Sequence, residues 1–544
     1  MRNSRPCNVF LVLLLIVQLW MPFSVKAADA TFFPIGIFQG VPVSAYPELA
    51  ESGFNVVQRS VYFPGKNENL SEEYSAARLN GLKILLDVPQ SIYGKPGLWG
   101  SDQSRAALRN KWIMENMAEK SLLAWTVASE PEHRNISPVF IANETSAVKA
   151  IDTAHPTALI INDWGQQAAQ YSESADILML DPYQAFGNGD IRDPSVAGYY
   201  KMLKTFKNAQ AFFSSGKPVW VIVGIHNMSQ YNPEFRPGRT PNYEEIRSMA
   251  YLSVVKGATG IFFYNYKASP LDSTPEHPGT WYGAKKVAKE ISLMADILLS
   301  PSIGAGTVAG DAIHYVVKNH ENHNYIIAVN TQPRAFEANI QVVTNEPALK
   351  TPGENRLLAV VDGRIQDRFN PFAVHIYTDA TKPPLLDNVH ESGREAMLLD
   401  HLFAEGRKNN LAARDGVVVT ASSVNERNHP TTRVTSAIDG IRGSAWVAKR
   451  GSASTEWLNI KLKKRSGIGR VVVEGNLEEF SVQSRIDGPW SNHCHFKDND
   501  EKRVECRLSE PVKANEVRIW IPIGPSGKRK AQLVRINEVE LYEK

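Results

Sequence analysis

An eightfold alternation of short apolar runs with polar, helix-compatible segments dominates residues 31–300. The apolar runs occupy 33–38, 55–60, 83–88, 122–128, 158–162, 177–180, 218–224 and 260–264. Each run is almost continuously hydrophobic, which is typical of a parallel strand that is buried on both faces. Eight strand–helix units in about 270 residues match the size of a closed (β/α)8 barrel, which we predict for residues 28–299. The alternative is a doubly wound open sheet, but no glycine-rich dinucleotide fingerprint follows the first run.

The first 27 residues have the pattern of a signal peptide. Arg2 and Arg5 precede an apolar run at 9–20 that is too short to span a bilayer, and small residues flank a cleavage site near Ala27. We therefore expect an exported protein, extracellular or periplasmic; an uncleaved membrane anchor is the alternative. Loss of Arg2, Arg5 and Lys26 cancels the net charge of +3. A balanced mature charge gives no reason to expect a nucleic-acid partner.

In a (β/α)8 barrel the chemistry lies at the carboxyl ends of the strands. The residues that end the second to eighth apolar runs include Arg59, Asp87, Glu130, Asn162, Asp163, Trp164, Asp181, Tyr183, His226 and Tyr264. Carboxyl groups and aromatic rings therefore converge on one rim. This combination suits a sugar, because one acid protonates the leaving oxygen, a second carboxylate supports the reacting carbon, and flat rings stack on sugar faces.

The stretch LAWTVASEPE at 123–132 resembles the fourth-strand motif of retaining barrel glycoside hydrolases. Residues 175–183 and 241–260 are similar to the sixth-strand end and the penultimate helix of such proteins. The resemblance implies that Glu130 is the general acid. It also exposes two departures: Ser129 stands where Asn or Asp is usual, and the seventh strand ends at His226 with no nucleophilic acid.

Three mechanisms remain open. Asp181 or Asp163 serves as the second carboxylate, or the substrate supplies its own nucleophile as an acetamido sugar does, or the barrel binds glycans without cleaving them. The first two make the protein a glycoside hydrolase; the third makes it a glycan-binding or adhesion protein. Either way we expect a polysaccharide or glycoconjugate partner, no catalytic cofactor and no transmembrane segment. The predicted substrate-binding residues are Arg59, Trp164, Tyr183, His226, Tyr264 and Trp281.

Beyond residue 300 the hydrophobic pattern changes to a period of two. Runs at 314–318, 325–330, 338–343, 357–361 and 374–377 predict antiparallel strands, and residues 300–379 look like the small β-sandwich that follows many glycosidase barrels. Residues 380–408 combine Pro383 and Pro384 with a charged, helix-like stretch, which favours a linker.

Residues 409–544 resemble the discoidin, or coagulation factor 5/8 type C, domain. The matching segments are 410–412, 420–423, 437–440, 445–446, 456–460 and 535–542. The resemblance implies an eight-stranded jelly roll that binds carbohydrate, with lipid head groups or proteins as the alternative ligands, and a structural calcium ion near Asp439 and Glu540. In an exported chain Cys494 and Cys506 form a reasonable disulfide; two free buried thiols are the alternative. The basic stretch at 449–470 is either a solvated face or a surface that attracts acidic glycans.

Overall fold

The computed structural model describes residues 32–39, 41–61, 70–89, 102–162, 168–171, 173–184, 186–187, 199–213, 215–228, 238–266, 278–414, 416–425, 434–438, 445–449, 455–522 and 534–543. The predicted signal peptide at 1–27 lies outside these residues. No helix among the described residues is long and apolar enough to cross a bilayer.

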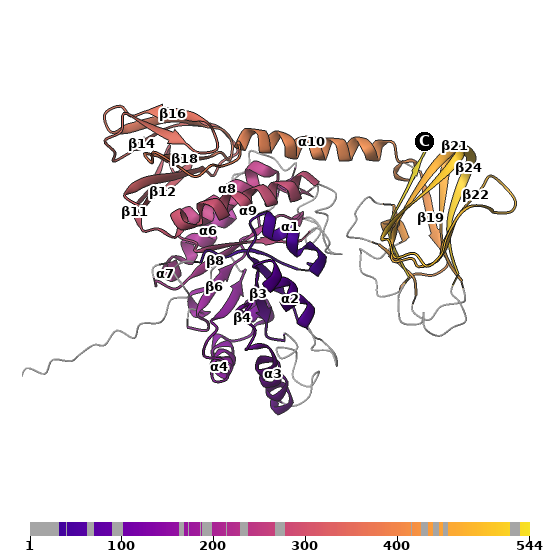
Figure 1. The fold of residues 1–544 in the computed structure, drawn as a ribbon, viewed down its shortest axis with the longest axis horizontal. Helices are drawn as coiled ribbons and strands as arrows, with labels where there is room; N and C mark the ends of the chain where they lie inside the picture. The colour runs from indigo at the N-terminus through magenta and orange to yellow at the C-terminus, as the bar shows by residue number, and fades with distance from the viewer. Residues whose placement is uncertain are drawn as a thin grey trace, which may run out of the picture.

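Eight parallel strands close into a barrel in the order β1-β10-β8-β6-β5-β4-β3-β2, which confirms the predicted fold (Figure 1). Their bounds are β1 Ile35–Ile37, β2 Val56–Arg59, β3 Lys83–Asp87, β4 Leu122–Ser129, β5 Thr157–Ile161, β6 Ile177–Leu180, β8 Val219–Gly224 and β10 Gly260–Tyr264. A separate short ribbon joins β7 Phe186–Gly187 to β9 Gly238–Arg239. Every barrel strand lies within two residues of its predicted range, because both of its faces are buried and its apolar run is uninterrupted.

Helices accompany the barrel strands. They are α1 Tyr46–Glu51, α2 Ser71–Leu79, α3 Asp102–Asn116, α4 Pro138–Lys149, α6 Tyr200–Asn208, α7 Gln210–Phe213, α8 Tyr243–Val255 and α9 Pro278–Leu299, with short 3-10 turns η1 Val43–Ala45, η3 Pro131–Arg134 and η4 Ala168–Tyr171. Inside the barrel, Leu85, Met179, Trp220 and Phe262 belong to one buried apolar cluster. The rings of Trp220 and Phe262 stack at 5.3 Å. Large side chains therefore pack inside the lumen, as is usual for this fold.

The second domain is the predicted antiparallel β-sandwich. One sheet has the order β11-β12-β13-β18-β15-β16 and the other pairs β14 with β17. Their bounds are β11 Ser302–Val308, β12 Ile313–His320, β13 His323–Asn330, β14 Phe336–Gln341, β15 Ala348–Thr351, β16 Arg356–Ala359, β17 Arg364–Phe369 and β18 Val374–Thr378. The pattern missed β11, β15 and β17. In β11 the sequence SIGAGTV has too few large apolar residues to mark a strand.

A buried ion pair ties the barrel to the sandwich. Arg247 on α8 contacts Glu290 on α9 at 2.8 Å, and both side chains are at most 7% exposed. The Tyr251 hydroxyl donates to the same carboxylate at 2.9 Å, and Arg247 Nη1 donates to the carbonyl of Val374 on β18 at 2.7 Å. The pair is therefore fully hydrogen-bonded, as a buried charge must be.

The segment predicted as a linker contains one helix, α10 Val389–Lys408. It runs from the sandwich along α9 to the C-terminal domain (Figure 1). Gly279 on α9 permits the close approach, because a Cβ there would collide with the Ala396 carbonyl on α10. The Gly279 N–H also donates to Asp400 at 2.8 Å. The helix α10 is thus packed against α9 through specific contacts.

The C-terminal domain is a β-sandwich built around two long strands. Its strands are β19 Val418–Ala421, β20 Trp446–Val447, β21 Thr455–Gly475, β22 Phe480–Arg485, β23 Ser491–Phe496, β24 Arg503–Pro522 and β25 Arg535–Tyr542, with 3-10 turns η8 Leu411–Ala413 and η10 Val434–Ala437. Irregular register interrupts the pairing of β21 with β24 near Lys461 and Arg470, so each long strand serves both layers. The described residues therefore form seven strands, where the resemblance implied eight. A disulfide joins Cys494 to Cys506 with the Cα atoms 5.9 Å apart.

Candidate functional site

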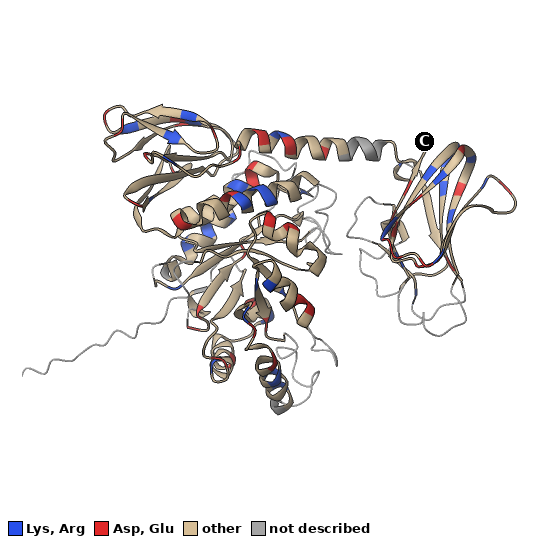
Figure 2. Cartoon of the chain, in the orientation of Figure 1, with Lys and Arg blue, Asp and Glu red and all other residues tan. Residues whose placement is uncertain are grey.

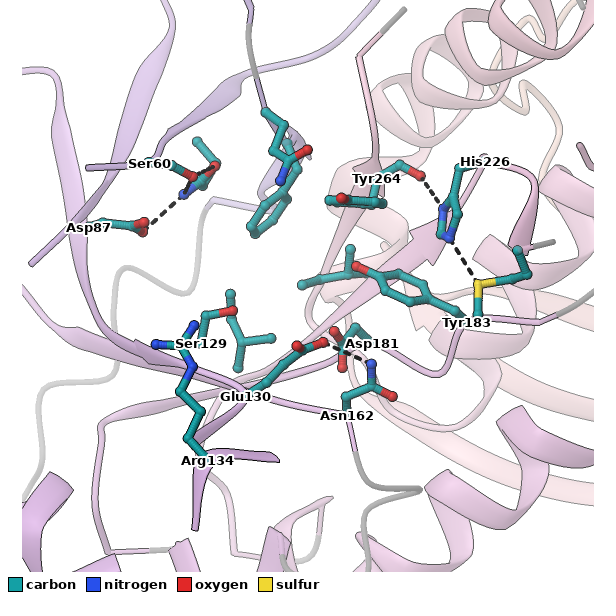
Figure 3. A pocket seen from close by; sticks show the side chains of 16 residues that line it. Ser60, Asp87, Ser129, Glu130, Arg134, Asn162, Asp181, Tyr183, His226 and Tyr264 are labelled. Carbon is teal, nitrogen blue, oxygen red and sulfur yellow. Dashed lines mark hydrogen bonds between the residues drawn. The ribbon is translucent and has the colours of Figure 1, made fainter. Parts of the chain in front are cut away.

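A cavity of about 350 Å³ lies at the carboxyl end of the barrel (Figure 3). This volume falls within the range of sites that hold small molecules. Its lining is Phe38, Gln39, Gln58, Ser60, Asp87, Ser129, Glu130, Arg134, Ile160, Asn162, Asp181, Tyr183, Ile222, His226, Met228 and Tyr264. Most of these residues end a barrel strand or follow it by one to four positions, so the barrel geometry alone brings them together.

Glu130 leaves the end of β4 in an unusual backbone conformation. Its N–H still donates to the Ile160 carbonyl on β5 at 2.9 Å, but its φ of 49° and ψ of 52° are left-handed. Pro131 then starts the 3-10 turn η3. A left-handed residue other than glycine costs about 1–3 kcal/mol and concentrates at functional sites. The turn directs the Glu130 carboxyl group into the cavity (Figure 3).

Glu130 faces Asp181, which follows β6 (Figure 3). Burial and the adjacent Glu130 carboxyl, through its charge and a side-chain hydrogen bond, raise the pKa of Asp181 well above its usual range. Asp181 is 2% exposed, so ionisation of this carboxyl group is disfavoured. Its Oδ1 is buried and has no hydrogen-bond partner among the residues described.

Three further side chains arrange the carboxyl pair. Asn162, directly after β5, donates from Nδ2 to Glu130 Oε1 at 2.8 Å. Its own N–H donates to Glu132 Oε1 at 2.6 Å, so the buried Glu132 fixes the position of Asn162. Lys201 on α6 lies 3.5 Å from Asn162 Oδ1. Burial lowers the pKa of Lys201, while Asp181 and Glu130 oppose that change. The site therefore holds a cation next to two coupled acids.

An aromatic group forms the wall beside the carboxyl pair. Tyr183 and Tyr264 lie 5.3 Å apart, and the His226 ring meets them edge-on at 4.9 and 5.0 Å. His226 is nearly fully buried; its Nδ1 lies 3.2 Å from the Tyr264 carbonyl and its Nε2 2.9 Å from Met228 Sδ. Burial lowers the pKa of His226 to about 4. The imidazole is thus neutral above that pH and adds no charge to the cavity.

The other side of the cavity carries a third carboxylate (Figure 3). Asp87 ends β3 and accepts a hydrogen bond from Gln58 Nε2 at 2.9 Å. The same Gln58 nitrogen lies 3.0 Å from the Ser60 hydroxyl. These three side chains offer hydroxyl-recognising groups across from the carboxyl pair.

Of the predicted site residues, Glu130, Asp181, Tyr183, His226 and Tyr264 meet at this cavity. Asp163 and Trp164 lie outside the described residues. The structure does not bring the other two to the cavity wall. Arg59 lies 3.5 Å from Glu73 on α2, which turns its guanidinium toward the helix layer. Trp281 on α9 stacks on Phe54 at 6.0 Å and is buried, because the large indole completes the packing between helix and barrel.

Asp87 and Asn162 were expected on the rim as strand-end residues but were assigned no catalytic or binding role, and Lys201 was not expected there. Asn162 and Asp87 carry the same signal as Asp181, a polar residue at the end of a strand. Lys201 follows no strand and lies in the helix α6, so no local pattern marks it.

The predicted calcium site rests on Asp439 and Glu540. Asp439 lies outside the described residues. Glu540 accepts from Arg503 Nη2 at 2.7 Å, and a carboxylate neutralised by a guanidinium is a poor ligand for Ca²⁺. Within the described segments, no group of three or more His, Cys, Asp or Glu side chains is arranged to hold a metal ion.

Residues 418–534 match the family model of the F5/8 type C domain, which confirms the resemblance of the C-terminal region. A comparison with curated protein sequences finds no match. Among solved structures, the chain is similar to chitosan-binding module 1 of a chitosanase/glucanase from Paenibacillus sp. IK-5, at 18% identity. That match covers 24% of this chain and 98% of the module with a TM-score of 0.21.

Two enzymes of known structure follow a similar course over the N-terminal part. The α-amylase of Geobacillus thermoleovorans shares 9% identity over 66% of this chain and all of its own, with a TM-score of 0.45. A GH30 endoxylanase from Clostridium papyrosolvens shares 13% identity over 64% of this chain and 96% of its own, with a TM-score of 0.39. These similarities concern the course of the chain, not its chemistry.

Proposed function

We propose that this protein is an exported glycoside hydrolase that cleaves a glycan with substrate assistance, using Glu130 as the general acid. The observation that supports this proposal is the placement of Asp181, which is buried and faces Glu130 in the cavity. In two-carboxylate glycosidases the second acid must be ionised to act as the nucleophile or as the water-activating base. Burial and the Glu130 charge raise the pKa of Asp181, so this carboxyl resists ionisation and is a poor candidate for either role.

The pair instead suits a substrate that carries its own nucleophile. Glu130 delivers the proton of the pair to the glycosidic oxygen as the C1–O bond breaks. The carbonyl oxygen of a 2-acetamido group attacks C1 and forms a cyclic oxazolinium ion. Asp181 Oδ1, buried and unpartnered among the described residues, accepts the acetamido N–H. Lys201 stabilises the extra negative charge that remains on the pair once the proton has left.

Water completes the cycle. It adds to C1, the oxazolinium ring opens, and the proton that water loses returns to the pair. Tyr183 and Tyr264 provide flat surfaces beside the reacting sugar, and Asp87, Gln58 and Ser60 face its hydroxyl groups. The F5/8 type C domain would hold the enzyme on its polymer, which supports the glycan as partner.

Hydrolysis of matched aryl glycosides tests this proposal. We expect cleavage of 4-nitrophenyl glycosides or oligosaccharides that carry a 2-acetamido group, and at least 100-fold slower cleavage of the 2-hydroxy analogues. A thiazoline analogue of the oxazoline should inhibit competitively, and Glu130→Gln should lower turnover by about 10³-fold. Equal rates on 2-hydroxy substrates would overturn substrate assistance. Binding of glycans in the cavity without hydrolysis of any of them would support the non-catalytic alternative.

A further inference from the structure

The outer face of one sheet in the C-terminal domain carries a second group of aromatic and charged residues. Strands β23, β22, β24, β21 and β19 are adjacent there. In their register Trp457 pairs with Trp520, and Arg518 lies between Asn459 and Gln483. The alternate residues of β21 and β24 belong to the apolar core of the domain. Trp457, Trp520 and Arg518 therefore point away from that core and are partly exposed.

Arg518 is held between two indole rings. Its guanidinium carbon lies 4.9 Å from the Trp457 ring centre and 3.9 Å from that of Trp490, which reaches back from the hairpin between β22 and β23. We call Trp457, Arg518 and Trp490 the arginine stack. A guanidinium that lies against indole rings still has N–H groups to offer to a ligand. The Trp490 ring also lies 4.4 Å from the guanidinium carbon of Arg485, so two cations share this indole.

The charge of Arg518 is not balanced, in contrast with that of its neighbour Arg485. Arg485 donates to Glu516 from Nε at 2.9 Å and from Nη2 at 2.7 Å. Lys461 lies 3.7 Å from the same carboxylate. Arg518 Nε is buried without a hydrogen-bond partner, and no described residue forms an ion pair with Arg518. Burial first and Arg485 second lower the pKa of Arg518, while the Glu516 charge opposes them, so an added anion would balance a charge that is only partly compensated.

The net charge of this part of the sheet face is positive. Lys461 and Arg485 both pair with the single carboxylate of Glu516, Arg518 adds a third positive charge nearby, and Figure 2 shows basic residues on neighbouring strands of this domain. Trp520 lies next to Arg518 along β24 and offers an indole surface of the kind on which a pyranose ring stacks. A guanidinium edge pairs in-plane with carboxylate or sulfate oxygens, ideally through two hydrogen bonds.

We propose that this face is a binding site for an anionic saccharide, with a carboxylate or sulfate group on the N–H edge of Arg518 and the sugar ring against Trp520. The site is separate from the barrel cavity and requires no cleavage, so it does not depend on the proposed hydrolase activity. Charge complementarity selects the acidic sugar over a neutral one, and the adjacent indoles favour a sugar ring over a simple ion.

Calorimetric titration of the full chain tests this site. The probes are an α-1,4-galacturonate hexasaccharide, a sulfated heparin-derived hexasaccharide and neutral maltohexaose, at low salt. We expect an acidic probe to bind at least 10-fold more tightly than maltohexaose and its affinity to fall with added salt. Arg518→Gln should reduce that affinity at least 10-fold. Arg518→Lys keeps the charge but loses the planar guanidinium, so its affinity for the acidic probe should lie between those of the wild type and Arg518→Gln.

The matched control is Arg465→Gln, since Arg465 is 62% exposed and pairs with Asp487 in the same domain. It should change affinity by less than threefold. Glu130→Gln should also leave acidic-probe binding unchanged. Thermal unfolding of each variant separates loss of the site from loss of the fold, and Arg518→Lys preserves the test if Arg518→Gln unfolds. An equal loss in Arg465→Gln, equal binding of maltohexaose, or binding to phosphatidylserine vesicles without binding of either acidic probe would each overturn the proposal.

Discussion

The barrel cavity and the outer sheet face of the C-terminal domain hold their charges in opposite ways. In the cavity, Asp181 is buried against Glu130, and both burial and that neighbour favour the neutral form of Asp181. On the sheet face, Arg518 cannot lose its proton at any ordinary pH, so its charge persists between the indoles of the arginine stack. A group that can change its protonation suits proton transfer, whereas a group that cannot suits recognition.

The same contrast applies to ion pairs. Arg247 and Glu290 are 5% and 7% exposed, whereas Arg485 and Glu516 on the sheet face are 32% and 11% exposed. Both pairs are close and well oriented. Their energetic weight differs because breaking a buried pair leaves an uncompensated charge in a region without water, while an exposed partner regains its hydration.

The largest expected effect is on turnover, and it tests whether Glu130 and Asp181 act as one unit. Glu130→Gln and Asp181→Asn should each lower kcat/KM by about 10³-fold, since a positioned general acid contributes roughly 10²–10⁴-fold. The double variant should lose no more than about 10-fold beyond either single variant, because removing one member already disables the shared proton.

Steady-state kinetics of the wild type, the two single variants and the double variant on a 2-acetamido glycoside would measure these losses. Glu173→Gln is the control: it changes a barrel carboxylate that is 86% exposed, and it should keep full activity. Losses that multiply to about 10⁶-fold would instead assign Glu130 and Asp181 two independent roles.

The next prediction compares the two arginine–glutamate pairs directly. Arg247→Met should destabilise the barrel by about 3–5 kcal/mol, because Glu290 is left buried and the Val374 carbonyl loses its donor. Arg485→Met should cost less than about 1 kcal/mol in the C-terminal domain. Hydrogen exchange of barrel peptides and of C-terminal peptides, measured in the same full chain, reports each effect separately. Equal losses in the two domains would contradict the assigned dependence on burial.

Much of this architecture could be predicted from the sequence, and the reason differs between regions. Barrel strands such as β6 and β10 are buried on both faces, so their apolar runs mark them without knowledge of their partners. The F5/8 type C region was identified through spaced motifs at both of its ends. The sequence predicts a linker where the structure has α10, because the charged composition of that segment does not reveal that Gly279 lets α9 pack closely against it.

The site was predicted in part for a similar reason. Glu130, Asp181 and Tyr183 follow strands, and strand ends converge in a barrel. The hydrogen bond within the carboxyl pair, the contribution of Lys201 and the inward packing of Trp281 all depend on side-chain direction and on contacts between distant elements. Sequence spacing carries no information about these.

A pH titration of stability sharpens the contrast between neutral and charged groups. Burial lowers the pKa of His226 from an ordinary 6.5 to about 4, so the folded barrel resists protonation that the unfolded chain accepts. The stabilisation is complete above about pH 6.5 and is lost as the pH falls toward 4. The free energy of unfolding should change by about 3 kcal/mol, because each unit of pKa shift corresponds to about 1.36 kcal/mol.

Chemical denaturation between pH 4 and 7 would measure this slope, and His226→Gln should flatten it. His314, which contacts Lys256 at 2.8 Å and whose pKa burial also lowers to about 4, provides the matched variant His314→Gln in the sandwich. Each substitution should remove its own part of the slope. A wild-type slope that survives both substitutions would place the acid sensitivity elsewhere.

The smallest expected effect concerns Lys201, a cation that acts on the pKa of the buried acid Asp181. Lys201 lowers the pKa of Asp181, against the larger effects of burial and Glu130 that raise it. Lys201→Met should therefore raise the pKa of Asp181 further. Because turnover needs the proton on the pair, the alkaline limb of the kcat/KM profile should move to higher pH. The maximum rate should fall by about 10-fold, since the doubly ionised pair left after proton transfer loses its cation. Lys201→Arg should restore the position of the limb. A purely structural Lys201 would lower the rate at every pH and leave the limb where it is.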